Sequence, residues 1–319
     1  MMAKGKPTPP IDDLLTLRDW LRYGVSVFNR AGLVYGHGTT TALDEAAFLI
    51  LSSLNLPVDA LEPWLDCRLT RSERQAVADI FSARVETRKP ASYLTNSAWI
   101  QGHKFYVDER VIVPRSFIGE LLCRDGLASV AGEGEGVALI LDLCTGSGCL
   151  AILAALTFPD ARVIASDISP DALEAAKKNV EDYKLGHRIQ LVHADLFAGL
   201  PAQHFDLIIA NPPYVTAAAV DAFPPEYRAE PQLAHLGGAD GMDLVHRILD
   251  RAGDFLTPAG SLVVEIGDGR DNLEAARTDL PFLWLDTETS EGEVFALSAT
   301  ELAAVSKTAA RTSRKDHES

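Results

Sequence analysis

The sequence predicts a doubly wound α/β fold: a mostly parallel sheet with a reversed final strand, preceded by a small helical domain and a β-hairpin linker. Three observations support this prediction. Strand-like and helix-like segments alternate from Val137 onward, which is typical of a parallel sheet covered by helices. A glycine-rich turn follows the first of these strands. Apolar residues between Ile11 and Pro90 recur at helical spacing.

Residues 1–90 are expected to form the helical domain, after a polar, proline-rich stretch at residues 1–10. Helical patterns begin at Ile11, cover Asp44–Leu54 and cover Leu69–Arg88. Thr70 and Glu73 have capping-box spacing at the start of the third pattern. This third helix carries a set of arginines: Arg71, Arg74, Arg84 and Arg88. Its basic face is interpreted as solvated, with RNA contact as the alternative.

Residues 91–113 change character and predict a β-hairpin linker. Short strand-like runs lie at Trp99–Ile100, Lys104–Val107 and Val111–Val113. A helix is expected over Ser116–Val130, and a flexible spacer over Gly132–Gly136.

Residues 114–305 are expected to form the second domain, followed by a disordered tail at residues 306–319. The segments of this domain alternate as follows: strands at Val137–Leu143, Arg162–Ser166, Arg188–Val192, Phe205–Ala210 and Ser261–Ile266, and helices at Cys149–Thr157, Pro170–Leu185 and Met242–Phe255. Phe282–Asp286 and Glu293–Leu297 follow with no long helix between them. We interpret these last two runs as a hairpin, so the sheet is expected to end with one antiparallel strand.

Composition and charge restrict the class of protein. The 319 residues are 47% hydrophobic and 23% charged, as in an ordinary globular protein. A formal net charge of −16 argues against stable binding to DNA or another duplex nucleic acid, and it suits a basic protein partner. No run approaches the roughly 20 apolar residues that span a bilayer, and the N-terminus does not resemble a secretion signal. We therefore expect a cytoplasmic protein with no membrane partner and no metal site.

A glycine-rich loop connects the first strand of the second domain to the next helix. Glycines there allow the backbone to approach a ligand, and the helix N-terminus attracts an anionic group. The candidate cofactor-binding residues of this loop are Asp142, Thr145, Gly146 and Gly148. By itself the loop also fits a nicotinamide dinucleotide, because Gly146, Gly148 and Ala151 match the dinucleotide fingerprint.

Acidic residues follow the next two strands. Asp167 closes the second strand, where its carboxylate can accept hydrogen bonds from ribose hydroxyls. Asp195 follows the third strand, with Phe197 close behind it. An acid and an aromatic suit an adenine, the first accepting from the amino group and the second packing on the ring. Each signal alone is weak, because dinucleotide enzymes share the first and loop acids are common.

The motif Asn211-Pro212-Pro213-Tyr214 ends the buried strand Phe205–Ala210, at the sheet edge where ligands bind in open α/β folds. Consecutive prolines restrict the backbone, so the Asn211 side chain and the Pro212 carbonyl can be held as two hydrogen-bond acceptors. An amide or amino nitrogen has two N–H donors to match, and Tyr214 can cover its flat face. We therefore predict that Asn211, Pro212 and Tyr214 are catalytic and that all four motif residues bind the substrate.

With these motifs the chain resembles the HemK/PrmB family of protein N5-glutamine methyltransferases, from about Ile11 to Leu297. The resemblance implies a class I (Rossmann-like) methyltransferase fold and S-adenosylmethionine as cofactor. The residues that match the family's cofactor-binding positions are Asp142, Gly146, Gly148, Asp167 and Asp195. The residues that match its glutamine-binding site are Asn211 to Tyr214. Asn211 is also expected to contact the cofactor.

Five segments are similar to the branch of this family that modifies ribosomal protein three of the large subunit. They are Tyr35–Thr39, Tyr93–Asn96, Phe105–Arg110, Val113–Ser116 and Glu226–Pro231. The sister branch acts on the Gly-Gly-Gln motif of peptide chain release factors and has Pro-Glu-Thr where this chain has Ser116-Phe117. One departure is His235, where the family usually has a small or aliphatic residue. The resemblance implies the ribosomal protein as substrate and partner.

The expected reaction is methyl transfer to a glutamine side-chain nitrogen. The lone pair of an amide nitrogen is delocalised, and no strong base stands beside Asn211 in the sequence. We therefore expect catalysis by positioning, which can contribute about 7–11 kcal/mol.

Three alternatives stay open at this point. They are the release-factor branch, a methyltransferase for adenine N6 of a flipped nucleotide, and a non-catalytic ribosome-assembly factor of the same fold. The charge of −16 opposes the second, and the intact Asn211 motif opposes the third. The helical domain is expected to dock the substrate. The sequence leaves open which glutamine is modified, whether RNA of assembly intermediates takes part, and the oligomeric state.

Overall fold

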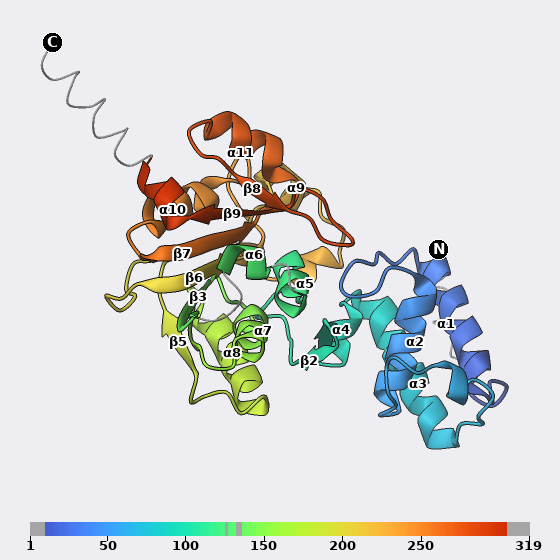
Figure 1. Cartoon of the computed structure of the whole chain (residues 1–319). Helices are drawn as coiled ribbons and strands as arrows, with labels where there is room; N and C mark the ends of the chain where they lie inside the picture. Colours follow the sequence, from blue (N-terminus) through green and yellow to red (C-terminus); the bar gives the residue numbers. More distant parts are fainter. Residues whose placement is uncertain (1–9, 125–126, 132–135, 305–319) are drawn as a thin grey trace, which may run out of the picture. The chain divides into compact units, whose positions relative to one another are not determined.

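The computed structural model describes residues 10–124, 127–131 and 136–304. The chain forms two compact units (Figure 1). The first comprises Met1–Ser97 together with Phe223–Ala229, and the second comprises Ala98–Ala222 and Glu230–Ser319. The first unit thus contains a segment from far along the chain as well as the N-terminal helices. The predicted tail, residues 306–319, lies outside the described residues.

The first unit is helical. Its elements are α1 (Leu17–Ala31), α2 (Ala42–Ser53), the 3₁₀ turn η1 (Glu62–Trp64), α3 (Arg71–Thr87), α4 (Ala91–Leu94) and the 3₁₀ turn η3 (Tyr227–Ala229). Thr16, Thr41 and Thr70 cap the first three α-helices by accepting a backbone N–H with the side-chain hydroxyl. The first helix begins after Thr16, and not at Ile11 as predicted, because Thr16 and Asp19 form a capping box there.

Three large aromatic side chains pack among mostly aliphatic residues in the core of the first unit. Trp20, Phe28 and Phe81 are buried, and the Phe28 and Phe81 rings lie edge to face with centroids 5.0 Å apart. Gly24 permits this packing, because a Cβ at that position would lie 2.6 Å from the Phe81 ring. A side chain at position 24 would therefore displace the ring of Phe81.

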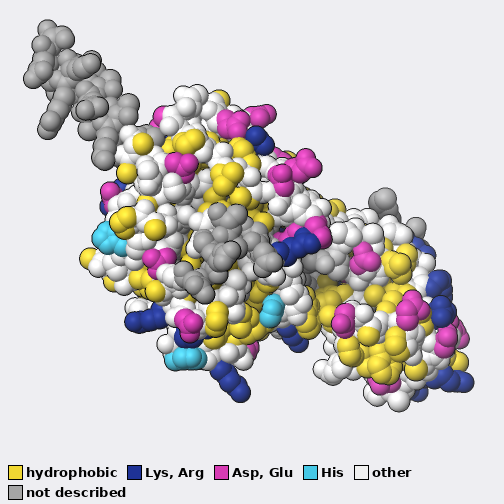
Figure 2. Space-filling view, in the orientation of Figure 1, with side chains coloured by type: hydrophobic (Ala, Val, Ile, Leu, Met, Phe, Trp, Pro, Cys, Tyr) yellow, Lys and Arg dark blue, Asp and Glu magenta, His cyan; other side chains and the backbone are white. Residues whose placement is uncertain are grey.

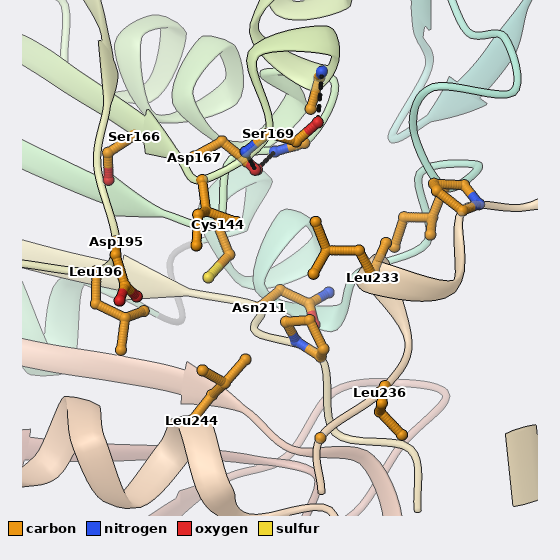
Figure 3. A pocket seen from close by; sticks show the side chains of 18 of the residues that line it. Cys144, Ser166, Asp167, Ser169, Asp195, Leu196, Asn211, Leu233, Leu236 and Leu244 are labelled. Carbon is orange, nitrogen blue, oxygen red and sulfur yellow. Dashed lines mark hydrogen bonds between the residues drawn. The ribbon is translucent and has the colours of Figure 1, made fainter. Parts of the chain in front are cut away.

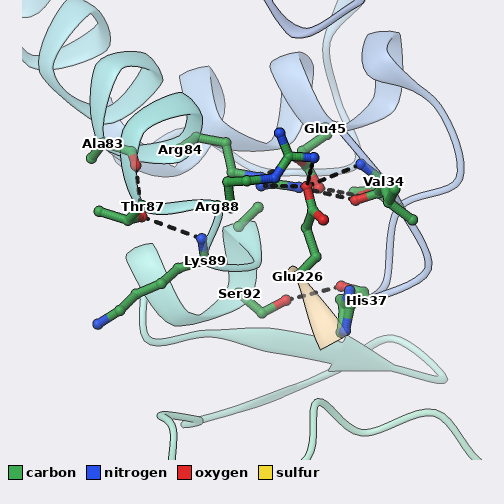
Figure 4. A network of polar contacts seen from close by, with 12 residues as sticks. Val34, His37, Glu45, Ala83, Arg84, Thr87, Arg88, Lys89, Ser92 and Glu226 are labelled. Atoms are coloured by element: carbon green, nitrogen blue, oxygen red, sulfur yellow. Dashed lines mark hydrogen bonds and ion pairs between the residues drawn. The ribbon is translucent and has the colours of Figure 1, made fainter. Parts of the chain in front are cut away.

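A buried ion cluster joins α2, α3 and the segment Phe223–Ala229 within the first unit (Figure 4). Arg84 Nε lies 2.6 Å from Glu45 Oε1, and Arg88 Nη2 lies 2.6 Å from Glu226 Oε1. The Arg84 side chain has no exposed surface, and the Arg88 side chain is 26% exposed. The prediction of one solvated basic face on α3 is therefore wrong for these two arginines, because their carboxylate partners come from distant segments.

Two of the branch-specific motifs meet in the first unit. The Tyr227 ring lies 4.3 Å from the His37 ring, measured between centroids. Gly36, with φ at 130°, leaves room for the Tyr227 hydroxyl, which a Cβ at that position would overlap. The segments Tyr35–Thr39 and Glu226–Pro231 thus have a shared packing reason to occur together.

The second unit is built on a seven-stranded sheet in the order β5-β4-β3-β6-β7-β9-β8. The strands are β3 (Leu139–Leu143), β4 (Arg162–Asp167), β5 (Ile189–His193), β6 (Phe205–Ala210), β7 (Leu256–Glu265), β8 (Leu283–Leu285) and β9 (Val294–Ser298). The five strands from β5 to β7 in this order pair in parallel. The chain runs outward from β3 to β5 and returns to β6 beside β3, so a topological switch point lies between β3 and β6. The predicted doubly wound fold is confirmed.

The last strand is reversed, as predicted, but it does not lie at the edge of the sheet. β9 pairs antiparallel with both β7 and β8, so β8 is the edge strand. Burial explains this order. Residues Val294–Leu297 are all buried, which suits an interior position, whereas Leu283 is 54% exposed.

Helices cover both faces of this sheet (Figure 1). One hydrophobic cluster contains residues of α5 (Phe117–Cys123), α7 (Cys149–Thr157) and α8 (Pro170–Asp182); the other contains residues of α10 (Asp243–Ala252) and α11 (Arg270–Ala276). Shorter elements are α6 (Ala128–Ala131), α9 (Ala217–Asp221), η4 (Gln232–Ala234) and η5 (Gly267–Gly269). Along β6, Leu207 and Ile209 join the first cluster, and Ile208 and Ala210 join the second. None of the described helices is long and apolar enough to cross a bilayer.

The region between the predicted domains differs from the prediction. The hairpin exists, since β1 (Ala98–Ile100) and β2 (His103–Phe105) pair antiparallel, but it groups with the second unit and does not form a separate linker. Val111–Val113 is not a strand, because the Val113 N–H donates to the side chain of Glu230 at 2.8 Å. The predicted helix from Ser116 ends at Cys123, after which Arg124 adopts an extended backbone.

Candidate functional site

A pocket of about 500 Å³ lies at the carboxyl ends of β3, β4, β5 and β6 (Figure 3). The predicted site residues that line it are Gly146, Asp167, Asp195, Asn211 and Pro213. The predicted residues that do not line it are Asp142, Thr145, Gly148, Pro212 and Tyr214. The pocket therefore brings the motifs that follow four separate strands to one place.

Asp142 and Thr145 shape the glycine-rich loop after β3. Asp142 is completely buried, and its Oδ2 accepts the Thr145 hydroxyl at 2.5 Å. The Thr145 N–H donates to the Ser166 carbonyl at 2.9 Å, which ties the loop to β4. Burial raises the pKa of Asp142 to about 7. These contacts hold the loop in shape, so both residues act on the pocket through the backbone.

The loop glycines have conformations that other residues rarely adopt. Gly146 and Gly148 have φ values of +55° and +78°. A Cβ on Gly146 would meet no atom within 4 Å, so open space lies above its backbone in the pocket. A Cβ on Gly148 would lie 3.1 Å from the Ala176 Cβ, so this glycine permits close packing of α7 on α8.

Asp167 stands at the end of β4, with both carboxylate oxygens engaged by the backbone. Its Oδ2 accepts the Gly146 N–H at 2.9 Å, and its Oδ1 accepts the Ser169 N–H at 2.9 Å. Burial raises the pKa of this carboxyl group above its usual value. Each oxygen of a carboxylate has a second lone pair, so Asp167 can still accept hydrogen bonds from ribose hydroxyls.

Asp195 is paired with a residue that the sequence reasoning missed. Arg247 in α10 donates through Nη2 to both Asp195 oxygens at 2.8 Å and lines the same pocket. Both side chains are about half exposed, at 46% for Asp195 and 51% for Arg247. The predicted aromatic partner is wrong: Phe197 stacks on Phe255 in the core with centroids 4.6 Å apart. Leu196 lines the pocket instead, because its φ of +50° turns the chain.

Asn211 is held by a buried glutamate at the end of the neighbouring strand. The Asn211 Nδ2 donates to Glu265 Oε1 at 3.1 Å. Glu265 is 1% exposed, and burial raises its pKa to about 7. The sequence reasoning missed Glu265, although an acid at the end of the apolar run Leu262–Val264 was a usable signal.

Tyr214 ends the Asn211 motif, and its contacts and those of the following loop fix the position of this segment. Tyr214 is partly buried and packs against the hydrophobic core, and Gly267 leaves space for its ring, because a Cβ on Gly267 would lie 2.7 Å from Tyr214 Cε2. Burial raises the pKa of Tyr214 above its ordinary value. Val215 pairs with the loop that contains Leu236, and the Val215 N–H donates to the His235 carbonyl at 2.8 Å.

A second buried carboxylate anchors this loop. Glu230 accepts Arg115 through both oxygens at 2.8 Å, and Arg115 belongs to the branch-specific segment before α5. The His235 Nε2 lies 3.0 Å from Glu230 Oε2. His235, which departs from the family pattern, is thus part of the anchor for residues Pro231 to Leu236, several of which line the pocket.

Comparison with known proteins gives a consistent result. A family model described as the methyltransferase small domain matches residues 133–223. A protein of Burkholderia pseudomallei (strain K96243) called ribosomal protein uL3 glutamine methyltransferase is 53% identical over 306 residues, covering 94% of this chain and 98% of its own. Proteins with the same name from Bradyrhizobium diazoefficiens and Neisseria gonorrhoeae are 51% and 54% identical. They cover 94% and 91% of this chain, and 97% and 96% of their own length.

Proposed function

The chain belongs to the family of ribosomal protein uL3 glutamine methyltransferases, and we propose that it transfers a methyl group from S-adenosylmethionine to the side-chain amide nitrogen (N5) of a glutamine in uL3. The observation that carries this proposal is the position of Asn211 and Pro213 in the same pocket as Gly146 and Asp167. The reaction would take place in the cytoplasm, where ribosomal proteins are made.

The residues of the pocket fit S-adenosylmethionine. The open space above Gly146 is a cradle that a Cβ would fill, and Asp167 stands at the end of β4 with acceptor capacity left. We propose that Gly146 and Asp167 hold the methionine and ribose parts, and that Asp195 accepts from the adenine amino group. Leu196 and Leu244 then provide apolar surface in place of the predicted Phe197. When bound, the cofactor supplies an electrophilic methyl group on a sulfonium.

Asn211 and Pro212 are proposed to bind the glutamine amide as two acceptors. The Asn211 Nδ2 is already engaged by Glu265, which leaves the Asn211 Oδ1 for the substrate N–H. Two acceptors direct the nitrogen lone pair at the methyl group and stabilise the positive charge that grows on the nitrogen. The proton then leaves to water, so no strong base is required beside Asn211.

The first unit is proposed to dock uL3. Arg84 and its neighbour Arg88, at the end of α3, are engaged by buried carboxylates, so the basic surface of this helix is smaller than its sequence indicates, which favours a protein substrate over RNA. Hydrogen exchange of the full chain with and without uL3 tests the assignment. Protection within residues 10–97 on adding uL3 is expected, and protection confined to the second unit would contradict it.

The deciding experiment is methyl transfer from labelled S-adenosylmethionine to purified, unmethylated uL3 and, separately, to a release factor with a Gly-Gly-Gln motif. Label on a glutamine of uL3 alone is expected, identified by mass spectrometry of the peptides. Label on the release factor alone would replace the proposed substrate. Label on neither protein, with cofactor bound, would refute the proposal for free uL3 and direct the test to RNA-containing assembly intermediates. Asn211→Ala serves as the control: its turnover should be about 100-fold lower, with little loss of cofactor affinity.

A further inference from the structure

Glu265 is a buried acid whose position is set by the sheet. It closes β7, which pairs in parallel with β6 so that Val264 stands beside Ala210. The next residue of the chain after β6 is Asn211, and its Nδ2 donates to Glu265 Oε1 at 3.1 Å. The side chain of Glu265 is therefore adjacent to the motif residue that is proposed to bind the substrate.

The second oxygen of this carboxylate is committed elsewhere. Glu265 Oε2 accepts the Ser116 hydroxyl at 2.5 Å, the Phe117 N–H at 2.9 Å and the Ile118 N–H at 3.4 Å. Backbone N–H groups can only donate, so the group opposite them must be an acceptor. One oxygen of the carboxylate is therefore occupied by these donors, and the other, Oε1, is the atom that faces Asn211.

We propose that Glu265 is the positioning residue that decides which end of the Asn211 amide faces the pocket, an inference that rests on the proposed function. An ionised Oε1 has no hydrogen to donate, so it attracts Nδ2 and turns the Asn211 Oδ1 toward the substrate. The site therefore offers an acceptor to the substrate N–H group. If the Asn211 amide were reversed, its NH₂ group would face the NH₂ group of the substrate glutamine. Two donors cannot form a hydrogen bond, so the substrate would not bind in the orientation needed for methyl transfer.

The ionisation state of Glu265 follows from its surroundings. Desolvation by burial raises its pKa to about 7, while the hydrogen bonds from Ser116, Ile118 and Phe117 lower it. Glu293 before β9 also raises it. Tyr214 and Cys149, which face the same region, have raised pKa values and stay neutral around pH 7. Protonation at Oε1 would let Glu265 donate to the Asn211 Oδ1, so turnover is expected to increase as pH rises through about 7.

Glu265→Gln separates orientation from packing, because the two side chains have nearly the same volume. In this variant the oxygen of the introduced amide must face the backbone N–H groups of α5, which puts its NH₂ group opposite Asn211. The Asn211 amide then has to reverse. We expect kcat to fall about 100-fold, with cofactor affinity within about twofold of wild type. Glu120→Gln is the matched control, since Glu120 is a buried glutamate of α5 that contacts Arg124 and Glu288 and does not line the pocket.

A donor–acceptor exchange provides rescue. In the double variant Asn211→Asp with Glu265→Gln, one oxygen of the introduced aspartate accepts from the NH₂ group of the introduced glutamine, and the other oxygen faces the pocket as an acceptor. We expect kcat at least about tenfold above that of Glu265→Gln alone. A purely structural role for Glu265 predicts no such recovery, because the second substitution restores nothing that the first had disturbed.

Nuclear magnetic resonance of the Asn211 side-chain amide decides the orientation without any substrate. With asparagine labelled by ¹⁵N, the wild-type NH₂ signal should exchange slowly and titrate near pH 7, and Glu265→Gln should shift it strongly. The inference is overturned if Glu265→Gln keeps turnover within about threefold of wild type, or if the Asn211 signal does not respond to pH or to the variant. Since the wild-type titration needs neither uL3 nor a folded variant, it decides the orientation even if the proposed substrate is wrong. Failure of wild-type protein to label uL3 would count against the proposed function alone.

Discussion

Removing the Glu226 carboxylate tests how the segment Phe223–Ala229 is held in the first unit. Glu226 has no exposed surface and receives Arg88 at 2.6 Å and the Val34 N–H at 3.1 Å, with Arg84 Nη1 at 3.7 Å. Glu226→Ala leaves the cluster of two arginines and Glu45 with one positive charge in excess in the interior. Breaking a buried ion pair from one side costs about 3–5 kcal/mol.

We expect the lower end of this range, about 3 kcal/mol, for Glu226→Ala. Arg84 keeps Glu45 at 2.6 Å, and Arg88 keeps the carbonyl oxygens of Ala31 and Gly32 at 3.1 and 2.8 Å. With a urea slope of about 2 kcal/mol per molar, the unfolding midpoint should fall by about 1.5 M.

The assay is urea unfolding followed by tryptophan fluorescence of the full chain. Trp20 and Trp64 lie in the first unit, so replacing Trp99 and Trp284 with Phe restricts the signal to that unit. The control is Asp66→Ala, which breaks the pair between Arg18 and Asp66, whose side chains are 58% and 84% exposed; its midpoint should not change. A Glu226→Ala midpoint no lower than that of the control would refute the reasoning.

Two further predictions follow from the second unit. Gly267→Ala should lower turnover, because Gly267 has a φ of +52° and a Cβ there would lie 2.7 Å from the Tyr214 ring. The control is Gly102→Ala, which should lower stability alone, because Gly102 has a φ of +75° but a Cβ there would meet no atom within 4 Å. Steady-state kinetics and thermal unfolding separate the two effects, and equal turnover in both variants would contradict the crowding at Tyr214. Stability should also depend on pH, since burial raises the pKa of Glu265 and of Asp142 to about 7 in the folded state, above ordinary values of 4.5 and 3.8. This contribution is complete below those ordinary values and is lost as pH rises through about 7. The free energy of unfolding in urea, measured near pH 5.5 and 8.5, should therefore change less with pH in Glu265→Gln than in wild type. An identical change in both proteins would count against a contribution from Glu265.

Segments with a strong local pattern had the bounds that the sequence predicts. Cys149–Thr157 and Phe205–Ala210 form a helix and a strand over those same residues. Each is a largely apolar run with glycine or proline nearby at one end, so local backbone preferences and burial agree. The Asn211 motif therefore lies at the carboxyl edge of the sheet as predicted from its position after such a strand.

Side-chain direction in loops was not predictable in the same way. Phe197 was expected beside the cofactor, yet it packs on Phe255, because Leu196 adopts a left-handed conformation that reverses which side chain faces the pocket. A single backbone angle at a non-glycine residue has no clear sequence signal. The same limit applies to Arg247, which reaches Asp195 from a helix far along the chain.

The sequence by itself determined the succession of strands and helices along the chain, because that succession depends on local periodicity. It also determined the doubly wound class and the sheet edge where Asn211, Gly146 and Asp167 meet, because these follow from the rules of parallel-sheet connection. Only the tertiary structure decided that Glu265 orients its acceptor toward Asn211 and that Arg84 points inward to Glu45. The residues of these pairs lie 54 and 39 positions apart, and they meet only when their elements pack. Burial then changes their electrostatics, since an ionised group in the interior must find its partners there.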